Sequence, residues 1–187
     1  MKQPTEEQIA LLRTILEKSI DQLIAKDSVI FNFDIVTPQR ISSDARLLNR
    51  KLHETTINHR LAFYIEQNIQ GTELSIYNVD IEYNRYYRDQ KLLKTVKGLL
   101  SVRPDILIHT RIDNRVPQQH YLVIEAKKGE ISQHDIDKIT SFISDTNYLY
   151  LFGLTISYCK SDTHVLANLY YFDGMRIVSK KIRRPKV

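Results

Sequence analysis

Two apolar runs in this chain carry charged side chains at one end. Asp105 opens the run 106–108, whereas Glu125 and Lys127 close the run 121–124. Burying such charges costs several kcal/mol per ion unless they are paired or bind a metal. We therefore expect the two runs to form neighbouring strands that build a functional site.

The residue types in these runs suit metal-assisted phosphodiester hydrolysis. If the strands pair, Asp105 and Glu125 converge on one hard cation, Mg²⁺ or Mn²⁺, with the carbonyl of Ala126 as a third candidate ligand. Such a cation polarises a phosphoryl oxygen and lowers the pKa of a bound water. Lys127, on the same strand face as Glu125, would orient that water or offset charge on the phosphorus. The alternative is a buried ion pair in a structural sheet.

The elements that must position these residues follow from hydrophobic periodicity. Helical spacing of apolar residues predicts helices, and period-two or continuous apolar runs predict strands. Their order, with helices between groups of strands, predicts an α/β fold with a mixed central sheet flanked by helices. The predicted helices cover about 5–26, 44–70 and 132–145, and the predicted strands cover 28–34, 75–84, 105–110, 119–126, 149–157, 165–172 and 175–182.

The second predicted helix carries a carboxylate on its apolar side. Leu47, Leu61 and Ile65 form one stripe, and Glu54 and Asn58 fall on that same stripe. A carboxylate that faces the core needs a partner. Glu54 is therefore a candidate contributor to the site.

A basic segment at 85–102 is a candidate nucleic-acid interface. Its cations could grip a phosphate backbone, and Tyr86 and Tyr87 could stack on bases; a solvated basic loop is the equally weighted alternative. The terminal segment 180–186 is expected to be a flexible basic arm. The chain has a formal net charge of +5, which mildly favours an acidic partner. The basic residues of the segment are Arg85, Arg88, Lys91, Lys94 and Lys97.

For several other polar residues, a structural role is favoured over a functional one. For Asp80 and Glu82 we favour ion pairs with Arg60 or Arg85 over a second metal shell. His109 would lie on the same strand face as Asp105, but contact with the phosphate of a substrate is the less favoured role for it.

The sulfur and histidine content excludes some classes of site. No pair of histidines has zinc spacing. The single cysteine, Cys159, excludes an internal disulfide and a four-cysteine zinc site, and we interpret it as a packed thiol. No signal peptide or membrane-length apolar run is found, so we expect a cytoplasmic protein without a membrane partner.

Four segments together resemble the PD-(D/E)xK nuclease superfamily, in particular a small uncharacterised prokaryotic branch. They are ETTINHR at 54–60, VDIEYNR at 79–85, RPDILIH at 103–109 and LVIEAKK at 122–128; Asp137 and Lys138 fit the pattern loosely. The resemblance implies a restriction-endonuclease-like core, α-β-β-β-α-β, with an extra N-terminal helix. We expect an N-terminal helical extension (1–43) packed on a nuclease-like domain with a basic C-terminal tail (44–187).

Carried over to this chain, the resemblance implies that Asp105 and Glu125 bind the metal and that Lys127 is the catalytic lysine. Glu54 matches the helical glutamate that often reaches the metal. The implied activity is that of an Mg²⁺- or Mn²⁺-dependent endonuclease acting on DNA rather than RNA. A homodimer is expected, because duplex cutters of this size often need two active sites. The alternative is a catalytically silent nucleic-acid- or protein-binding module on the same fold.

Overall fold

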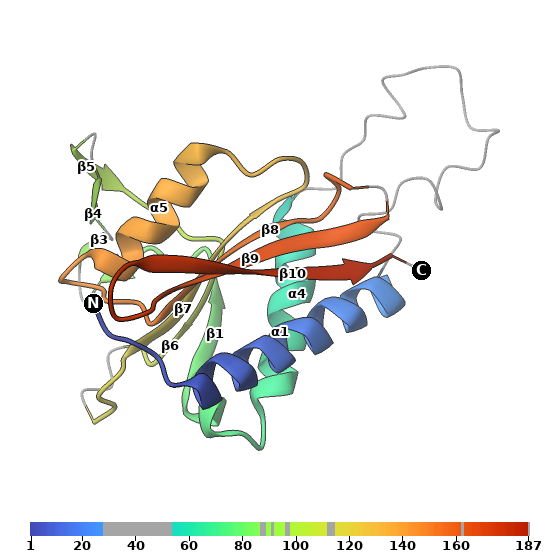
Figure 1. Cartoon of the computed structure of the whole chain (residues 1–187), viewed down its shortest axis with the longest axis horizontal. Coiled ribbons are helices and arrows are strands. Elements are labelled where there is room, and N and C mark those ends of the chain that lie inside the picture. Colours follow the sequence, from blue (N-terminus) through green and yellow to red (C-terminus); the bar gives the residue numbers. More distant parts are fainter. Residues whose placement is uncertain are drawn as a thin grey trace.

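The computed structural model of the chain describes residues 1–27, 54–86, 89–90, 92–95, 98–111, 115–161 and 163–186. Within these ranges it has three α-helices: α1 (Glu6–Asp27), α4 (Glu54–Ile69) and α5 (Gln133–Ser144) (Figure 1). None of the helices in the described part is both long and apolar enough to cross a bilayer.

The centre of the molecule is a six-stranded mixed sheet with the strand order β1-β6-β7-β8-β9-β10. Only the β7–β8 pair is parallel, and the other neighbouring strands of this sheet pair antiparallel. Because α5 lies between β7 and β8 in the chain, it supplies the crossover that a parallel pair requires. The predicted α/β class is confirmed. The strands are β1 (Asn78–Ile81), β6 (Ile106–His109), β7 (His120–Lys127), β8 (Phe152–Ser157), β9 (His164–Phe172) and β10 (Ile177–Pro185).

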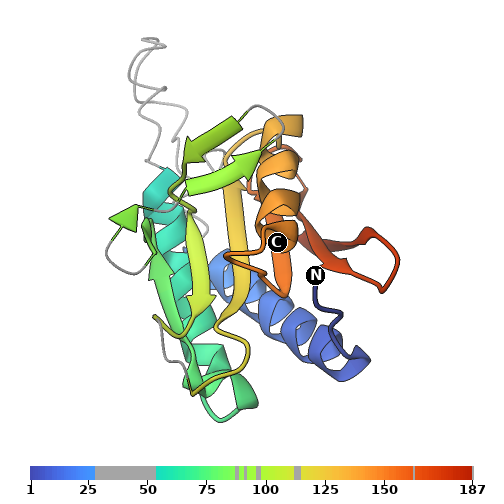
Figure 2. The same cartoon turned by 90° about the vertical axis from the view of Figure 1, so that its left-hand side faces the viewer.

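The helices cover the two faces of the sheet unequally. α1 and α4 lie together on one face and α5 on the other (Figures 1 and 2). The alternation of side chains along each strand supplies both cores: Ile106 and Ile108 of β6 join the α1–α4 side, whereas Leu107 joins the α5 side. At Gly153 of β8 an added Cβ would lie 2.4 Å from Cγ2 of Ile139, so glycine permits the close packing of α5.

Two short hairpins precede β6. One pairs β2 (Arg85–Tyr86) with β3 (Asp89–Gln90), and the other pairs β4 (Leu92–Thr95) with β5 (Gly98–Ser101). β4 contacts α5, and Leu93 is buried in the core on that side. The segment expected to be a nucleic-acid interface or a solvated basic loop therefore contains a hairpin that packs against α5 through β4.

Several predicted boundaries shift for local reasons. The strand predicted from residue 75 is preceded by a 3₁₀ turn, η2 (Glu73–Ile76), because the Thr72 side chain caps it. β1 then ends before Glu82, whose φ is 50°. β8 begins three residues later than predicted, because Leu149 has a φ of 45° and closes a turn with Asp145.

The C-terminal segment is the clearest correction. The flexible basic arm expected at 180–186 is strand β10 as far as Pro185, paired along β9. Ile182 anchors it, since its side chain is 1% exposed in the core beneath α1. The predicted strand 28–34 and the boundary at 43 and 44 lie outside the described residues. Where it is described, the N-terminal extension packs through α1 against α4 and β10.

Candidate functional site

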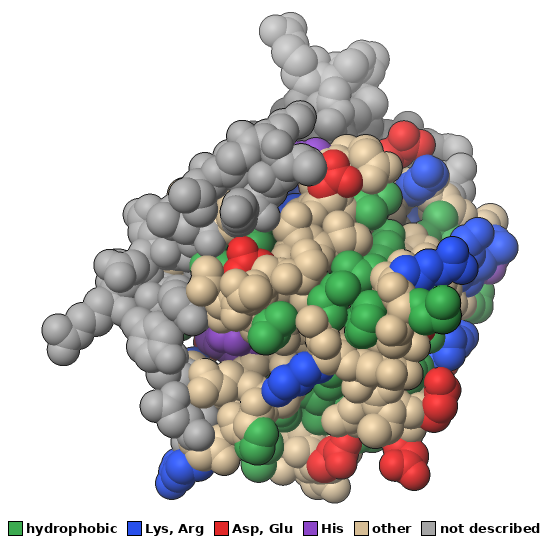
Figure 3. Space-filling model, turned by 60° about the vertical axis from the view of Figure 1, so that its left-hand side comes forward, with side chains coloured by type: hydrophobic (Ala, Val, Ile, Leu, Met, Phe, Trp, Pro, Cys, Tyr) green, Lys and Arg blue, Asp and Glu red, His purple; other side chains and the backbone are tan. Residues whose placement is uncertain are grey.

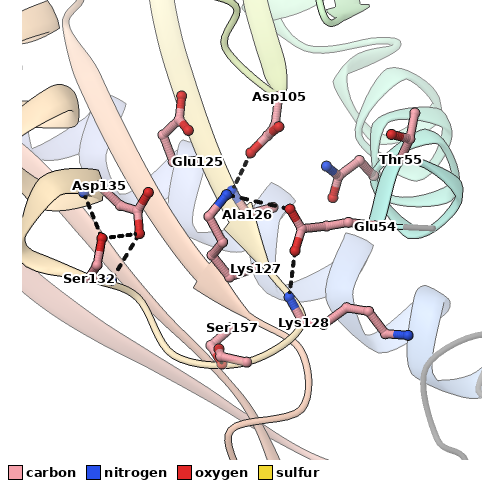
Figure 4. A network of polar contacts seen from close by, with 12 residues as sticks. Glu54, Thr55, Asp105, Glu125, Ala126, Lys127, Lys128, Ser132, Asp135 and Ser157 are labelled. Atoms are coloured by element: carbon pink, nitrogen blue, oxygen red, sulfur yellow. Dashed lines mark hydrogen bonds and ion pairs between the residues drawn. The ribbon is translucent and has the colours of Figure 1, made fainter. Parts of the chain in front are cut away.

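Asp105 and Glu125 meet where β6 begins and β7 ends. Ile106 lies opposite Ile124, so the preceding Asp105 and the following Glu125 are neighbours across the antiparallel pair. One carboxylate oxygen of Asp105 accepts a hydrogen bond from the backbone N–H of Ala126 at 2.8 Å (Figure 4). The strand pairing predicted from the two apolar runs is therefore confirmed.

Glu125 is held in the core on the α5 side of the sheet. Its side chain is 3% exposed, and its Oε1 lies 2.6 Å from Nζ of Lys138 in α5. Burial raises the pKa of Glu125 to about 7; Lys138 opposes that rise, and the neighbouring Asp105 adds to it. A single ammonium group therefore does not fully compensate the charge of this carboxylate.

Glu54 reaches the same end of β7 from α4, which lies on the other face of the sheet. Its Oε1 is 3.4 Å from Nζ of Lys127, and its Oε2 accepts a hydrogen bond from the backbone N–H of Lys128 at 2.8 Å (Figure 4). Burial alone would lower the pKa of Lys127, but Asp105 and Glu54 raise it above its ordinary value. The amine therefore stays protonated.

The charged form of Asp105 is also disfavoured by its surroundings. Burial raises its pKa, although the N–H of Ala126 and the ammonium of Lys127 favour its charged form. Two adjacent carboxylates that both resist ionisation mark a place where a cation would be stabilised. The oxygen donors of this set suit a hard divalent ion, so the residues present fit Mg²⁺ or Mn²⁺.

The three acidic side chains do not form a ready metal cage. Within the described ranges, no three His, Cys, Asp or Glu side chains are gathered closely enough to hold an ion. In the view of Figure 4, Glu125 lies on one side of the β7 ribbon and Glu54 on the other. Asp105 lies beside the backbone of Ala126 in β7. The structure thus brings Glu54, Asp105 and Lys127 to one strand end, and pairs Glu125 with α5.

Lys138 is a site residue to which the sequence assigned no contact. It belongs to the inward side of α5, between the buried Asp135 and Phe142. Asp135 completes a capping box with Ser132, accepting its backbone N–H at 2.8 Å. The signal was the helical spacing: Lys138 lies three residues after the buried Asp135 and four before the buried Phe142, so it shares their inward face.

The predicted basic interface falls largely outside what the structure describes. Arg88, Lys91 and Lys97 are not among the described residues. Arg85 belongs to β2 and Lys94 to β4, and their side chains are not described. The proposed contact of this segment with nucleic acid stays a prediction.

A second polar cluster joins β1 to the far end of β6. Asp80 accepts hydrogen bonds from Nε of Arg111 at 2.6 Å and pairs with Nε2 of His109 at 2.9 Å. Burial alone would raise the pKa of Asp80, but Arg111 and His109 overcome it and hold that pKa well below its ordinary value. The favoured interpretation of Asp80 as an ion-paired residue is confirmed, with partners other than those predicted.

The remaining predicted polar contacts are resolved as follows. Arg60 pairs with Asp27 at 2.9 Å, on α1, rather than with β1. Glu82 lies 3.6 Å from Arg103. Cys159 is half-buried, and burial raises its pKa, which disfavours the reactive thiolate.

No protein-family model matches the chain, and no curated protein matches its sequence.

Proposed function

We propose that this chain is a divalent-metal-dependent nuclease that hydrolyses phosphodiester bonds, with DNA as its substrate. The observation that carries the proposal is the pairing of Asp105 with Glu125 across β6 and β7, with the pKa of both carboxyls raised, beside the protonated Lys127. A structural ion-pair network has no need of adjacent acids that resist ionisation. A site that binds a cation gains from them.

The metal, Mg²⁺ or Mn²⁺, would be held by Asp105 and Glu125, with Glu54 and the carbonyl of Ala126 as further candidates. When bound, it would supply Lewis acidity toward a phosphoryl oxygen and a water of lowered pKa. The charged amine of Lys127 would stabilise negative charge that grows on the phosphate. Glu54 acts as a positioning residue, since it contacts both that amine and the backbone of Lys128.

The architecture supports the same proposal. Among the helices and the strands of the main sheet, α4 is followed by β1, β6, β7, α5 and β8, with β2–β5 inserted between β1 and β6 and with β7 and β8 parallel. This order supports the proposal, because it is compatible with the α-β-β-β-α-β core that the resemblance to PD-(D/E)xK nucleases implies. The net charge of +5 also suits a polyanionic substrate.

A cleavage panel tests the proposal. Purified chain is incubated with single-stranded, duplex and branched DNA and with RNA, in Mg²⁺, in Mn²⁺ and in EDTA. We expect cleavage of DNA that requires the cation, and a loss on the order of 10³-fold in Asp105→Asn and Glu125→Gln, within the range of acid–base and metal-site removals. Glu7→Gln, an exposed charge on α1, is the matched control and should cleave normally. A chain that cuts none of these substrates under any condition contradicts the proposal.

A second candidate function is supported by a specific observation. Each of the three carboxylates already contacts an ammonium or a backbone N–H of the chain itself. A catalytically silent binding module on this scaffold would show the same self-satisfied network. It predicts salt-sensitive DNA binding that survives the combined changes Asp105→Asn, Glu125→Gln and Lys127→Met, with no cleavage by the unmodified chain.

A further inference from the structure

A cavity of about 460 Å³ lies between the start of α5 and the outer strands of the sheet. Its floor is the part of β9 and β10 on the same face as α5, with Leu166 opposite Arg183 in the strand register. Ile131 and Ile136, from the start of α5 and the loop before it, form an apolar wall. We name this cavity the β10 groove.

The strand register connects the β10 groove to the candidate site. One row of neighbouring residues runs across the sheet from Lys127 through Ser157 and Leu166 to Arg183. The next row on the same face runs from Glu125 through Thr155 and Asn168 to Lys181. Three strand spacings separate the ends of each row, roughly 14 Å at about 4.8 Å per strand. The groove and the candidate site therefore share one face of one sheet.

The charge of the β10 groove is positive. Lys160, Lys181 and Arg183 line it, and no carboxylate is found among its described lining residues. Within the described part of the chain, Lys160 forms an exposed pair with Glu130 at 3.2 Å, and such surface pairs are weak. Lys181 and Arg183 are both exposed. Figure 3 shows one face of the molecule, on which Lys and Arg side chains lie along one margin with Asp and Glu side chains nearby.

The two sides of β10 use their basic residues differently. On the side toward α1, Lys180 lies 4.0 Å from Glu6, and Arg184 is paired with Asp21 through its Nε at 2.6 Å. These charges hold β10 against α1. Lys181 and Arg183 alternate with them and point to the groove side, so they are the ones available to an external anion.

Size and lining specify the occupant. The volume falls within the range of small-molecule pockets, ~300–1,000 Å³, which suits a strand of one or two nucleotides rather than a duplex. None of the described lining residues is aromatic, so base stacking is not the source of affinity. Cations with an apolar wall suit the phosphates and sugars of a single strand.

We propose that the β10 groove binds the sugar–phosphate backbone of a single DNA strand beside the candidate site, without regard to base sequence. This inference rests on the proposed function for its substrate. It specifies in addition which strands hold the substrate and in which form. The DNA strand crosses the β-sheet from the end of β7 toward β10, so that Lys181 and Arg183 contact phosphates a few nucleotides from the candidate site.

The test is a binding measurement without metal. Fluorescence anisotropy follows a labelled single-stranded oligonucleotide of about 12 nucleotides, within the usual site size, in EDTA at a series of salt concentrations. In the combined variant Lys160→Ala, Lys181→Ala and Arg183→Ala, we expect affinity at low salt to fall roughly tenfold or more. The slope of log K against log salt should fall in magnitude by about 2, since each phosphate contact of a single strand contributes about 0.7.

Matched controls separate the groove from general charge. The combined variant Lys18→Ala, Lys26→Ala and Lys180→Ala removes the same number of cations from α1 and from the other side of β10. It should retain the salt slope of the unmodified chain. The single changes Lys181→Ala and Lys180→Ala compare neighbouring residues that point to opposite sides, and only the first should weaken binding. Thermal unfolding confirms that each variant is folded.

Three results would overturn the inference. One is an unchanged slope and affinity in the groove variant, and another is an equal loss in the control variant. The third is competition by duplex DNA as effective as that by a single strand. Because binding is measured without a cation, a chain that binds through the groove but never cleaves would sink the proposed function alone. Cleavage by a chain whose groove variant binds normally would sink this inference alone.

Discussion

Two clusters of acidic and basic side chains lie at opposite ends of β6, and their carboxylates behave in opposite ways. At one end, the pKa of Asp80 is held well below its ordinary value by Arg111 and His109. At the other end, burial raises the pKa of Asp105 and of Glu125. Asp80 lies opposite Leu107, which is two residues along the chain from Asp105, so the two clusters occupy neighbouring positions of the same sheet.

The difference lies in how completely each charge is compensated. Asp80 has a guanidinium and an imidazole within hydrogen-bonding distance. At the candidate site, burial raises the pKa of both carboxyls; Asp105 adds to the rise at Glu125, Glu54 adds to the rise at Asp105, and the nearest amines only partly offset these effects. A cluster built for stability neutralises its charge within the chain, whereas the candidate site leaves a deficit that a cation from solution can fill.

The largest expected effect is on catalysis at Lys127. Lys127→Met should lower cleavage on the order of 10³-fold, because the point charge beside the phosphate is lost. Lys127→Arg should not restore the activity, since a planar fork does not replace an ammonium. Initial rates at saturating DNA and Mn²⁺ measure both.

The neighbouring lysine provides the control. Lys128 contacts Glu54 through its backbone N–H, and its side chain runs away from the site in Figure 4. Lys128→Met should therefore retain most of the activity. Equal losses at the two lysines would mean that only general positive charge matters.

The next effect concerns stability at the other cluster. Asp80→Asn should lower the free energy of unfolding by about 2–3 kcal/mol, because it leaves His109, which is 2% exposed, without its charged partner. Denaturant unfolding measures the change. Glu7→Gln should change stability little, and a loss as small in Asp80→Asn would show that the cluster is not the structural one.

The difference in unfolding free energy between the unmodified chain and Asp80→Asn should depend on pH. A carboxyl whose pKa is depressed by folding contributes stability that is present above its unfolded pKa, near 3.9, and lost as the pH falls toward the folded value. The stability advantage of the unmodified chain over Asp80→Asn should therefore be constant from pH 7 to about 5 and shrink below about pH 4. Unfolding curves at several pH values test this, and an advantage that grows on acidification would contradict it.

A smaller effect links α5 to the cation. Lys138→Met removes the ammonium 2.6 Å from Glu125 and should lower stability in EDTA. Added Mn²⁺ should then raise the melting temperature more in this variant than in the unmodified chain, by the equivalent of about 1 kcal/mol, since the cation replaces the missing charge. Equal rises in melting temperature in the two proteins would show that Glu125 does not take part in cation binding.

The sequence predicted the local elements of this fold well where periodicity was strong. The helix expected at 5–26 is α1, Glu6–Asp27, and the strand expected at 119–126 is β7, His120–Lys127. The meeting of Asp105 with Glu125 followed from two apolar runs that had to pair. These features depend on residues close together in the chain, whose spacing states the geometry directly.

Contacts between distant elements were harder to predict. That Glu54 would meet Lys127 depends on how α4 crosses the end of β7, which no local pattern fixes. The partners of Asp80 depend on the register in which β1 pairs with β6, which places Asp80 opposite Leu107 and near His109. The strand predicted at 175–182 is β10, Ile177–Pro185, and its last residues were expected to be a flexible arm because basic residues flank the buried Ile182. Basic side chains that alternate between two surfaces give no apolar pattern in the sequence, so the strand is recognised only when its neighbours are known.

The most direct test of the account is a calorimetric titration of Mn²⁺ into the unmodified chain, Glu125→Gln and Asp80→Asn. If the carboxylates at the end of β7 hold a divalent ion, the unmodified chain and Asp80→Asn should bind it alike, and Glu125→Gln should bind it at least tenfold more weakly, about 1.4 kcal/mol. Equal heats and affinities in all three proteins, or no binding in any, would contradict the account.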